Sequence, residues 1–242
     1  MSSAQPRGTA VVLLSGGMDS ATALAVARQE FRRIHCLTVL YGQRHRREIR
    51  SAQRLARYFR VLKHRVVRLP LAPLLRSALT NPRRALPRAR PGRKSPRIPS
   101  TYVPARNTIL LSIALGYAES IDAEAIYIGA NAIDYSGYPD CRPEYFRAFE
   151  RLARLATRSG VERGWDFKIE APLLNLSKAD IIRLGERLAV PWEMTWSCYA
   201  GNARPCGRCD SCALRARGFD AAGVADPLVA RSHMRSSRST PR

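Results

Sequence analysis

Residues 11–22, Val-Val-Leu-Leu-Ser-Gly-Gly-Met-Asp-Ser-Ala-Thr, decide the fold that we predict for this chain of 242 residues. The apolar, β-branched run at residues 9–14 indicates a buried strand, and the Ala-rich run at residues 21–31 indicates a helix. Gly16 and Gly17 stand between them, where glycine allows a tight turn and a close approach of the backbone to an anion. Because the first amides of a helix have no partner within it, this turn suits a phosphate group.

Strands and helices alternate outward from this stretch. Further strands are expected at residues 34–41, 64–69, 125–129 and 167–171. Further helices are expected at residues 46–60, 107–120, 143–159 and 177–188. Such alternation implies parallel strands joined by right-handed crossovers, so we predict an α/β fold with a doubly wound, mostly parallel, five-stranded sheet. Ligands of such sheets bind at the carboxyl ends of the strands.

Three regions follow from the pattern. Residues 9–190 would form the nucleotide-binding α/β domain, residues 191–226 a small region with four cysteines, and residues 227–242 a disordered tail rich in Ser and Arg. An Arg/Pro-rich loop at residues 76–100 interrupts the first region. Its residues 76–97 hold eight basic residues, four prolines and no acidic residue, which excludes a regular element. We favour a mobile loop over the site, and an arm that grips RNA is the alternative.

The charge of the chain is strongly positive. Lys and Arg number 41 and Asp and Glu 19, which gives a formal net charge of +22, and only four of the basic residues are lysines. A nucleic-acid partner would explain this charge. We favour an arginine-rich composition instead, because the arginines occur in every segment rather than in one stripe. The hydrophobic content of 45% excludes a wholly disordered chain, and no apolar run approaches the roughly 20 residues of a membrane span, so we expect a cytoplasmic protein with no membrane partner.

The polar residues of the glycine turn indicate the kind of phosphate site. Ser15 and Ser20 can add hydroxyl donors to the backbone amides. Asp19 places a carboxylate in a loop that would bind phosphate. Because the two anions repel each other, the sequence predicts a divalent cation, Mg²⁺, between the carboxylate and the phosphate. The turn lacks the lysine of a Walker A loop and the spacing of a dinucleotide-binding loop. Taken alone, the two glycines also suit an ordinary strand-to-helix turn.

Four of the six cysteines lie within fifteen residues, with the spacing Cys198-x7-Cys206-x2-Cys209-x2-Cys212. Two-residue gaps let successive thiolates converge on one ion, so a closed, structural Zn²⁺ site is the favoured hypothesis. An iron–sulfur cluster is the competing one, because such sites also use this spacing. Unliganded buried cysteines are the third interpretation. A nucleic-acid-reading zinc finger is disfavoured, since the ligands enclose too few residues for a reading helix.

Several motifs carry a resemblance to known families. The Ser-Gly-Gly-Met-Asp-Ser turn resembles the signature of the PP-loop ATP pyrophosphatases. From about residue 10 to residue 219, further motifs resemble, in order, those of the 7-cyano-7-deazaguanine synthases: Tyr-Gly-Gln-Arg-His at 41–45 with Glu48, Tyr-Val-Pro-Ala-Arg-Asn at 102–107, Asp-Tyr-Ser-Gly-Tyr-Pro-Asp-Cys-Arg at 134–142, Ser-Cys-Tyr at 197–199, and the last three cysteines with Leu214-Arg215. The loop at 76–97 and the tail fall outside this resemblance.

The resemblance implies both a fold and an activity. The fold is that of the adenine nucleotide α-hydrolase-like proteins. The activity is a step of queuosine biosynthesis, in which the carboxylate of 7-carboxy-7-deazaguanine is adenylated by ATP and converted with ammonia, through an amide, into 7-cyano-7-deazaguanine. It also implies a homodimer whose partners are the deazapurine and ammonia, without direct binding of tRNA. The alternatives are a tRNA-modifying adenylase of the thiolase or lysidine type, and a non-catalytic zinc-containing RNA-binding protein.

The resemblance assigns roles to four groups of residues. For ATP binding it implies Leu14, Ser15, Gly16, Gly17, Met18, Asp19, Ser20, Ala21, Thr22, Ala23 and Leu24. Asp19, Arg106 and Lys178 are the expected catalytic residues: Asp19 contacts Mg²⁺, and the two cations neutralise phosphate or carboxylate charge. Lys178 lies outside the matched motifs and is proposed because it opens a helix and is one of only four lysines; a solvated lysine in the first helical turn is the equal alternative. The deazapurine would contact Asn107, Asp134, Tyr135, Ser136, Gly137, Tyr138 and Asp140. The metal ligands would be Cys198, Cys206, Cys209 and Cys212.

The sequence does not decide the role of His45 and Glu48, and Cys141 needs a separate interpretation. His45 and Glu48 would share one face of a helix, as a pair that handles protons or as a surface ion pair. We interpret Cys141 as structural, because adenylation needs no thiol.

Overall fold

The computed structural model describes residues 7–43, 47–81, 83–87, 98–133, 138–165 and 167–228. Five strands form one sheet, β1 (Arg7–Leu13), β2 (Phe31–Leu40), β3 (Lys63–Arg68), β4 (Ala125–Ile128) and β5 (Lys168–Glu170). Every pairing is parallel, and the order is β3-β2-β1-β4-β5. This confirms the predicted α/β fold. The strand order reverses beside β1, which places the ligand-binding crevice at the carboxyl ends of β1 and β4.

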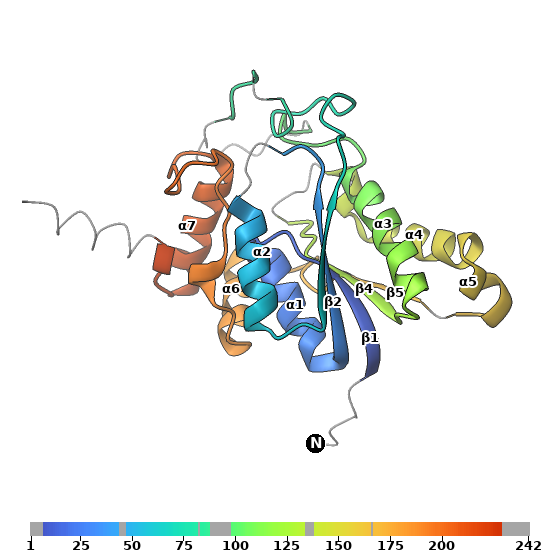
Figure 1. The fold of residues 1–242 in the computed structure, drawn as a ribbon. Coiled ribbons are helices and arrows are strands. Elements are labelled where there is room, and N and C mark those ends of the chain that lie inside the picture. The colour runs from blue at the N-terminus through green and yellow to red at the C-terminus, as the bar shows by residue number, and fades with distance from the viewer. Residues whose placement is uncertain are drawn as a thin grey trace, which may run out of the picture.

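Seven helices flank the sheet in the described residues: α1 (Met18–Glu30), α2 (Arg47–Tyr58), α3 (Arg106–Ser120), α4 (Pro143–Ala156), α5 (Arg158–Arg163), α6 (Lys178–Arg187) and α7 (Asp210–Ala222). Two short 3₁₀ helices, η1 (Pro139–Cys141) and η2 (Trp192–Met194), lie between them. Figure 1 shows α1, α2, α6 and α7 on one side of the sheet and α3, α4 and α5 on the other. None of the described helices has the length and apolar character needed to cross a membrane.

The core consists of two layers, one on each face of the sheet. Successive residues of β1 point to opposite faces, so Val12 packs against α1 and α2 while Val11 packs against α3 and α4. Both residues are fully buried, which explains why β1 is apolar along its length rather than alternating.

One edge of the sheet is exposed and basic. β3 forms hydrogen bonds only with β2 among the described strands, and its side chains Lys63, Arg65 and Arg68 are exposed. The buried Thr38 of β2 shares a hydrogen bond of 2.8 Å with His64 of this strand.

Two predicted elements differ from the structure, and one observed helix was not predicted. Phe31 does not end the first helix but begins β2, where its ring packs edge-on against Tyr127. The helix predicted at 143–159 breaks at Thr157, whose hydroxyl accepts from the amide of Gly160 and starts α5. The helix α7 was not predicted. In the Arg/Pro-rich loop, residues 76–81 and 83–87 contain turns but no helix or strand; residues 82 and 88–97, and residues 229–242 of the predicted tail, lie outside the described residues.

Candidate active site and metal centre

The turn between β1 and α1 is organised by one hydroxyl group. Ser20 Oγ accepts from the amides of Ser15 and Gly16, each at 3.2 Å, and donates to the carbonyl of Gly17 at 3.0 Å. These bonds fold the loop back on the first turn of the helix. Ser20 is buried and its main contacts lie within the loop, so its hydroxyl holds the loop in shape in this structure.

The two glycines of the turn have different reasons to be glycine. Gly16 has a φ of +91°, and a Cβ there would overlap the backbone of Glu48 and Ala52 in α2. At Gly17 a Cβ would meet only Ser15 Oγ at 3.5 Å and the carbonyl oxygen of Trp196 at 3.6 Å. Gly16 is therefore required by the fold, whereas Gly17 leaves open space at the start of α1.

The start of α1 has the features that an anion site needs. Gly17 is its N-cap residue and no side-chain hydrogen bond caps the helix. The first amides of an uncapped helix carry partial positive charge. Gly129, directly after β4, packs against this turn so closely that a Cβ would lie 2.7 Å from Ser20 N. The phosphate loop thus sits in the crevice between β1 and β4, where ligands of this fold bind.

Asp19 and Lys178 form an ion pair in this crevice. Lys178 Nζ donates to both carboxylate oxygens of Asp19, at 2.7 Å and 2.9 Å. The side chain of Lys178 is 8% exposed and that of Asp19 is 19% exposed, so water screens the pair weakly. Lys178 reaches the site from the first residue of α6, whose N-cap Ser177 accepts from the amide of Asp180.

Arg106 is the second cation of the crevice. It is mostly buried at the first residue of α3, after Ala105 in the left-handed conformation at φ 50°. Burial raises the pKa of the Tyr41 phenol, and Arg106 opposes this rise through its charge and a hydrogen bond. Burial also raises the pKa of Tyr138, and the charge of Arg106 again acts against the rise. The guanidinium group thus lies among hydroxyl groups in a site with little water.

Next to Arg106, a buried network leaves one acceptor unused. Asp140 Oδ2 accepts from the amide of Asn107 at 2.9 Å, and Asn107 Nδ2 donates to the carbonyl of Asp140 at 2.7 Å and to Cys141 Sγ at 3.4 Å. Asp140 is 5% exposed, and its Oδ1 has no hydrogen-bond partner. Burial raises the pKa of Cys141 to about 11, which keeps that thiol protonated. A buried carboxylate oxygen without a partner is costly unless a ligand donates to it.

One cavity of about 210 Å³ joins the loop, the ion pair, Arg106 and Asn107, whereas Gly16 and Asp140 do not line it. From the predicted residues it is lined by Leu14, Ser15, Gly17, Met18, Asp19, Ser20, Arg106, Asn107, Tyr138 and Lys178. Ala21, Thr22, Ala23 and Leu24 are buried in the core below the loop and do not line it. Glu48 lines the cavity, whereas His45, Asp134, Tyr135, Ser136 and Gly137 lie outside the described residues.

Sequence reasoning missed Gly129 and Trp196 as residues of this site. Trp196 lines the cavity, and its amide donates to the carbonyl of Gly16 at 2.9 Å. A glycine directly after a buried strand is a signal of close backbone approach and could have identified Gly129. No local pattern marks Trp196, because its contact joins segments that are 180 residues apart in the sequence.

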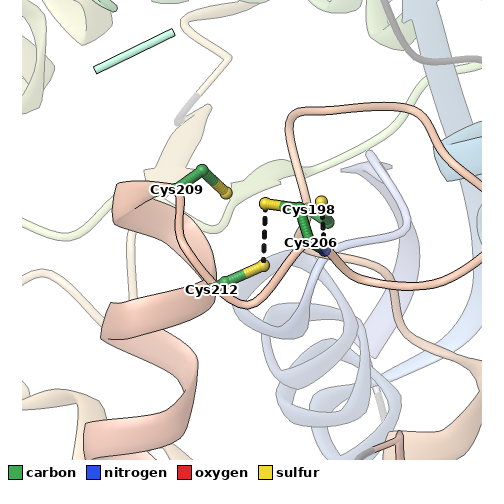
Figure 2. A group of neighbouring side chains, drawn as sticks. All are labelled: Cys198, Cys206, Cys209 and Cys212. Atoms are coloured by element: carbon green, nitrogen blue, oxygen red, sulfur yellow. Dashed lines mark hydrogen bonds between the residues drawn. The ribbon is translucent and has the colours of Figure 1, made fainter. Parts of the chain in front are cut away.

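The four clustered cysteines form a candidate metal centre, shown in Figure 2. Their Sγ atoms all lie within 4.8 Å of one another, and within the described residues this is the one group of three or more His, Cys, Asp or Glu side chains that could hold a metal ion. Tetrahedral thiolates at about 2.3 Å from one Zn²⁺ would be separated by roughly 3.8 Å, close to the 4.0 Å between Cys206 Sγ and Cys212 Sγ. The donor set therefore fits a single ion. In an iron–sulfur cluster the four thiolates are divided among two or four irons, so they would not all converge on one point as they do here.

The surroundings of the cluster support bound thiolates. Cys198 Sγ accepts from the amides of Ala200 at 3.4 Å and Cys206 at 3.3 Å. Hydrogen bonds with the thiols of Cys198 and Cys209 raise the pKa of Cys212, and burial and repulsion by the negative charges of the same neighbours raise it further. A cation at the centre would remove this repulsion.

One family model and several named relatives match nearly the whole chain. The family model for the queuosine biosynthesis protein QueC matches residues 9–223. The chain is 58% identical to the 7-cyano-7-deazaguanine synthase of Anaeromyxobacter dehalogenans (strain 2CP-C) over 220 residues, which cover 90% of this chain and 94% of that protein. It is 54% identical to the enzyme of the same name from Nostoc punctiforme (strain ATCC 29133 / PCC 73102), over 91% of this chain and 98% of that protein.

Likeness to solved structures is remote. A 4-thiouridine synthetase, solved as an RNA complex with bound ATP, aligns with a TM-score of 0.47 and 19% identity, over 96% of this chain and 54% of its own. The family assignment therefore depends on the sequence relatives and not on this structure. The match over residues 9–223 and the identities above 50% show that this chain belongs to the QueC family of queuosine biosynthesis proteins.

Proposed function

We propose that this protein is a 7-cyano-7-deazaguanine synthase, an ATP-dependent carbon–nitrogen ligase. It converts 7-carboxy-7-deazaguanine and ammonia into 7-cyano-7-deazaguanine. The observation that carries the proposal is one cavity lined by an uncapped helix start, two cations and a polar pocket, in a chain 58% identical to a relative with that name. The tRNA-modifying adenylase and the RNA-binding protein remain alternatives that none of these relatives favours.

The reaction needs a carboxylate to become a good electrophile. Its oxygen bonds to the α-phosphorus of ATP as pyrophosphate leaves, and ammonia then displaces AMP with loss of a proton to give the amide. A second activation of the amide oxygen, followed by loss of AMP and a proton, leaves the nitrile. Each activation concentrates negative charge on phosphate oxygens, so the site must supply positive charge at that place.

The phosphate loop and its ion pair suit this requirement. The free amides at the start of α1 bind phosphate oxygens, and Gly17 leaves room for them. Asp19 is the residue that would hold Mg²⁺, which supplies charge neutralisation when bound. With Asp19 so engaged, the ammonium group of Lys178 would exchange the carboxylate for phosphate oxygens in the same cavity, without a change at the base of its side chain.

Arg106, Tyr138 and Asp140 suit the deazapurine. The planar guanidinium of Arg106 can pair with the substrate carboxylate through two hydrogen bonds. The unpartnered Oδ1 of Asp140 can accept from an N–H group of the base, and a buried tyrosine ring can pack on its face. We extend the substrate site to Asp134, Tyr135, Ser136 and Gly137, which precede Tyr138 in the same loop.

The cysteine region completes the proposal. We infer that residues 191–226 form a zinc-binding region in which Cys198, Cys206, Cys209 and Cys212 hold one structural Zn²⁺. Such a site needs reduced thiols, which the cytoplasm maintains, so we propose a cytoplasmic enzyme. The family resemblance further supports a homodimer that acts on a small molecule without binding tRNA directly.

One assay tests the function. Purified protein is incubated with ATP, Mg²⁺, ammonium and 7-carboxy-7-deazaguanine, and the products are followed by mass spectrometry. We expect the carboxylate species to disappear and the nitrile to form with release of pyrophosphate. Failure to form nitrile with metal-loaded, folded protein would refute the proposal. ATP turnover that requires tRNA would support the tRNA-modifying alternative instead.

A further inference from the structure

We propose that Gly218, in the helix that follows the cysteine cluster, is a positioning residue for Lys178. The proposal rests on the function given above, because it concerns the cation that this function places at the phosphates. Lys178 belongs to α6 and Gly218 to α7, and neither helix contributes the phosphate loop. Contact with α7 sets the side-chain conformation of Lys178, so the cysteine region takes part in assembling the nucleotide site.

The contact between the two helices depends on the missing side chain of Gly218. A Cβ at this position would overlap Lys178 Cγ and would lie 3.1 Å from Lys178 Cβ and 3.0 Å from Ile182 Cδ1. The obstructed atoms lie at the base of the lysine side chain, close to the backbone. They cannot move without rotation of the whole side chain about its first torsions. The stem of Lys178 therefore lies flat on α7 because residue 218 is glycine.

The position of the stem determines where the ammonium group ends. Lys178 Nζ meets both oxygens of Asp19 at 2.7 Å and 2.9 Å, which requires one particular side-chain conformation. Rotation at the base would carry Nζ several ångströms away, since the stem is about five bonds long. An alanine at 218 would thus misplace the cation and spare the rest of the cavity, which Gly218 does not line.

The helix α7 is itself fixed to the site. Buried Arg215, one turn before Gly218, pairs with Asp226 at 2.7 Å and donates to Thr195 Oγ1 at 2.7 Å. Thr195 precedes Trp196, whose amide donates to the carbonyl of Gly16 in the phosphate loop. The segment from the loop contact to Gly218 contains all four cysteines. This arrangement gives α7 a fixed place against which Lys178 can lie.

The test uses the scarcity of lysine in this chain. Only four lysines are present, so reductive methylation with ¹³C-formaldehyde can be followed at each by mass spectrometry. Exposed Lys63 serves as the internal reference, and we expect Lys178 to be methylated much more slowly in the wild-type protein. In Gly218→Ala, methylation of Lys178 should rise by about tenfold or more, because its charged hydrogen bonds are lost. This measurement does not depend on turnover, so its failure is distinct from failure of the proposed function.

Kinetics separate positioning from a general loss of structure. Gly218→Ala should lower the kcat for pyrophosphate release by about 10- to 100-fold and leave the KM for the deazapurine within about twofold. Added to Lys178→Met, the same change should cause no further loss, since the group it misplaces is already gone. Unchanged methylation of Lys178, or an additional loss in the Lys178→Met background, would overturn the proposal.

Two controls address the steric effect itself. Gly116→Ala adds the same methyl group in α3, where nothing lies within 4 Å, and should change neither methylation nor kinetics. Ile182→Val removes the second atom that a Cβ at 218 would crowd. The double variant Gly218→Ala with Ile182→Val should regain thermal stability but keep the exposed Lys178. Recovery of Lys178 protection in this double variant would show that the effect came from core packing.

Discussion

Asp19 shows how one neighbouring side chain changes the meaning of a sequence motif. An isolated carboxylate in a phosphate-binding loop predicts a divalent cation, because a positive charge is needed between the carboxylate and the phosphate. In the structure Lys178 already supplies positive charge to both oxygens of Asp19. The two charges offset each other, so a cation that bound Asp19 would have to displace Lys178.

Asp19→Asn should abolish turnover and also lower stability. The amide keeps the shape of the side chain but removes the negative charge that it presents to Lys178, which is 8% exposed, and this should cost about 1–3 kcal/mol in the free energy of unfolding. Lys178→Met in the same chain should restore most of that stability and none of the activity. Thermal unfolding and pyrophosphate release measure the two effects. Normal turnover in Asp19→Asn would remove Asp19 from the mechanism.

Asp140→Asn tests the unpartnered carboxylate oxygen. The amide oxygen of the variant can still accept from the Asn107 amide, and its NH₂ group would then take the place of Oδ1. A donor would face a donor of the base, so we expect the KM for the deazapurine to rise by about 10-fold or more while the affinity for ATP stays unchanged. Titration calorimetry with each ligand measures both. An equal loss of affinity for both ligands would indicate a structural role instead.

At the scale of elements, the sequence predicted the strands, because their positions depend on local patterns. Apolar runs and glycine turns placed all five strands within a few residues of their observed bounds. The helix α7 was not predicted, because its sequence of small residues and arginines has no apolar stripe that would face a core. Its stability comes from distant partners: Phe219 packs edge-on against Trp192, and Arg215 pairs with Asp226. Contacts of this kind have no local signature.

The phosphate loop offers a comparison between adjacent glycines. Gly16→Ala should destabilise the protein by about 2–3 kcal/mol, because its positive φ and its contact with α2 both exclude a side chain. Gly17→Ala should leave the melting temperature nearly unchanged and weaken nucleotide binding by about 10-fold, since the methyl group would occupy the space for phosphate. Thermal unfolding and nucleotide titration distinguish the two. Full nucleotide affinity in Gly17→Ala would show that phosphate binds elsewhere.

The cysteine cluster offers a comparison between two kinds of buried thiol. Cys206→Ser should expel the metal and lower the melting temperature by about 10 °C or more, because three remaining thiolates cannot close a tetrahedral site. Cys36→Ala, a fully buried cysteine of β2, should lower stability without loss of metal. Elemental analysis and thermal unfolding of both variants provide the measurement. Full metal content in Cys206→Ser would show that the site is not a closed one.

At the scale of the whole molecule, the site is assembled from distant segments. Asp19 and Lys178 are 159 positions apart, and Arg106 lies between them in sequence. Family resemblance indicated these residues, and the parallel fold explains why they meet at one end of the sheet. Distances, the ion pair and the unused oxygen of Asp140 depend on packing of side chains, which no local pattern determines.

Because the cysteine region joins the phosphate loop at Trp196, metal and nucleotide should affect each other's binding. Protein treated with a chelator and then supplied with Mg²⁺ alone should bind a non-hydrolysable ATP analogue at least about 10-fold more weakly than the Zn²⁺-loaded protein. The coupling must be reciprocal, so the analogue should increase the affinity for Zn²⁺ by the same factor. Titration calorimetry before and after return of Zn²⁺ measures this effect. Equal affinity in the two states would show that the region and the loop act independently.

The exposed edge of the sheet has a consequence for self-association. An open edge strand can recruit a strand of another copy, and β3 carries three cationic side chains there, Lys63, Arg65 and Arg68. Two such edges would bring like charges together. This repulsion opposes sheet-to-sheet association through β3, so we expect any symmetric pair of chains to meet through a different face.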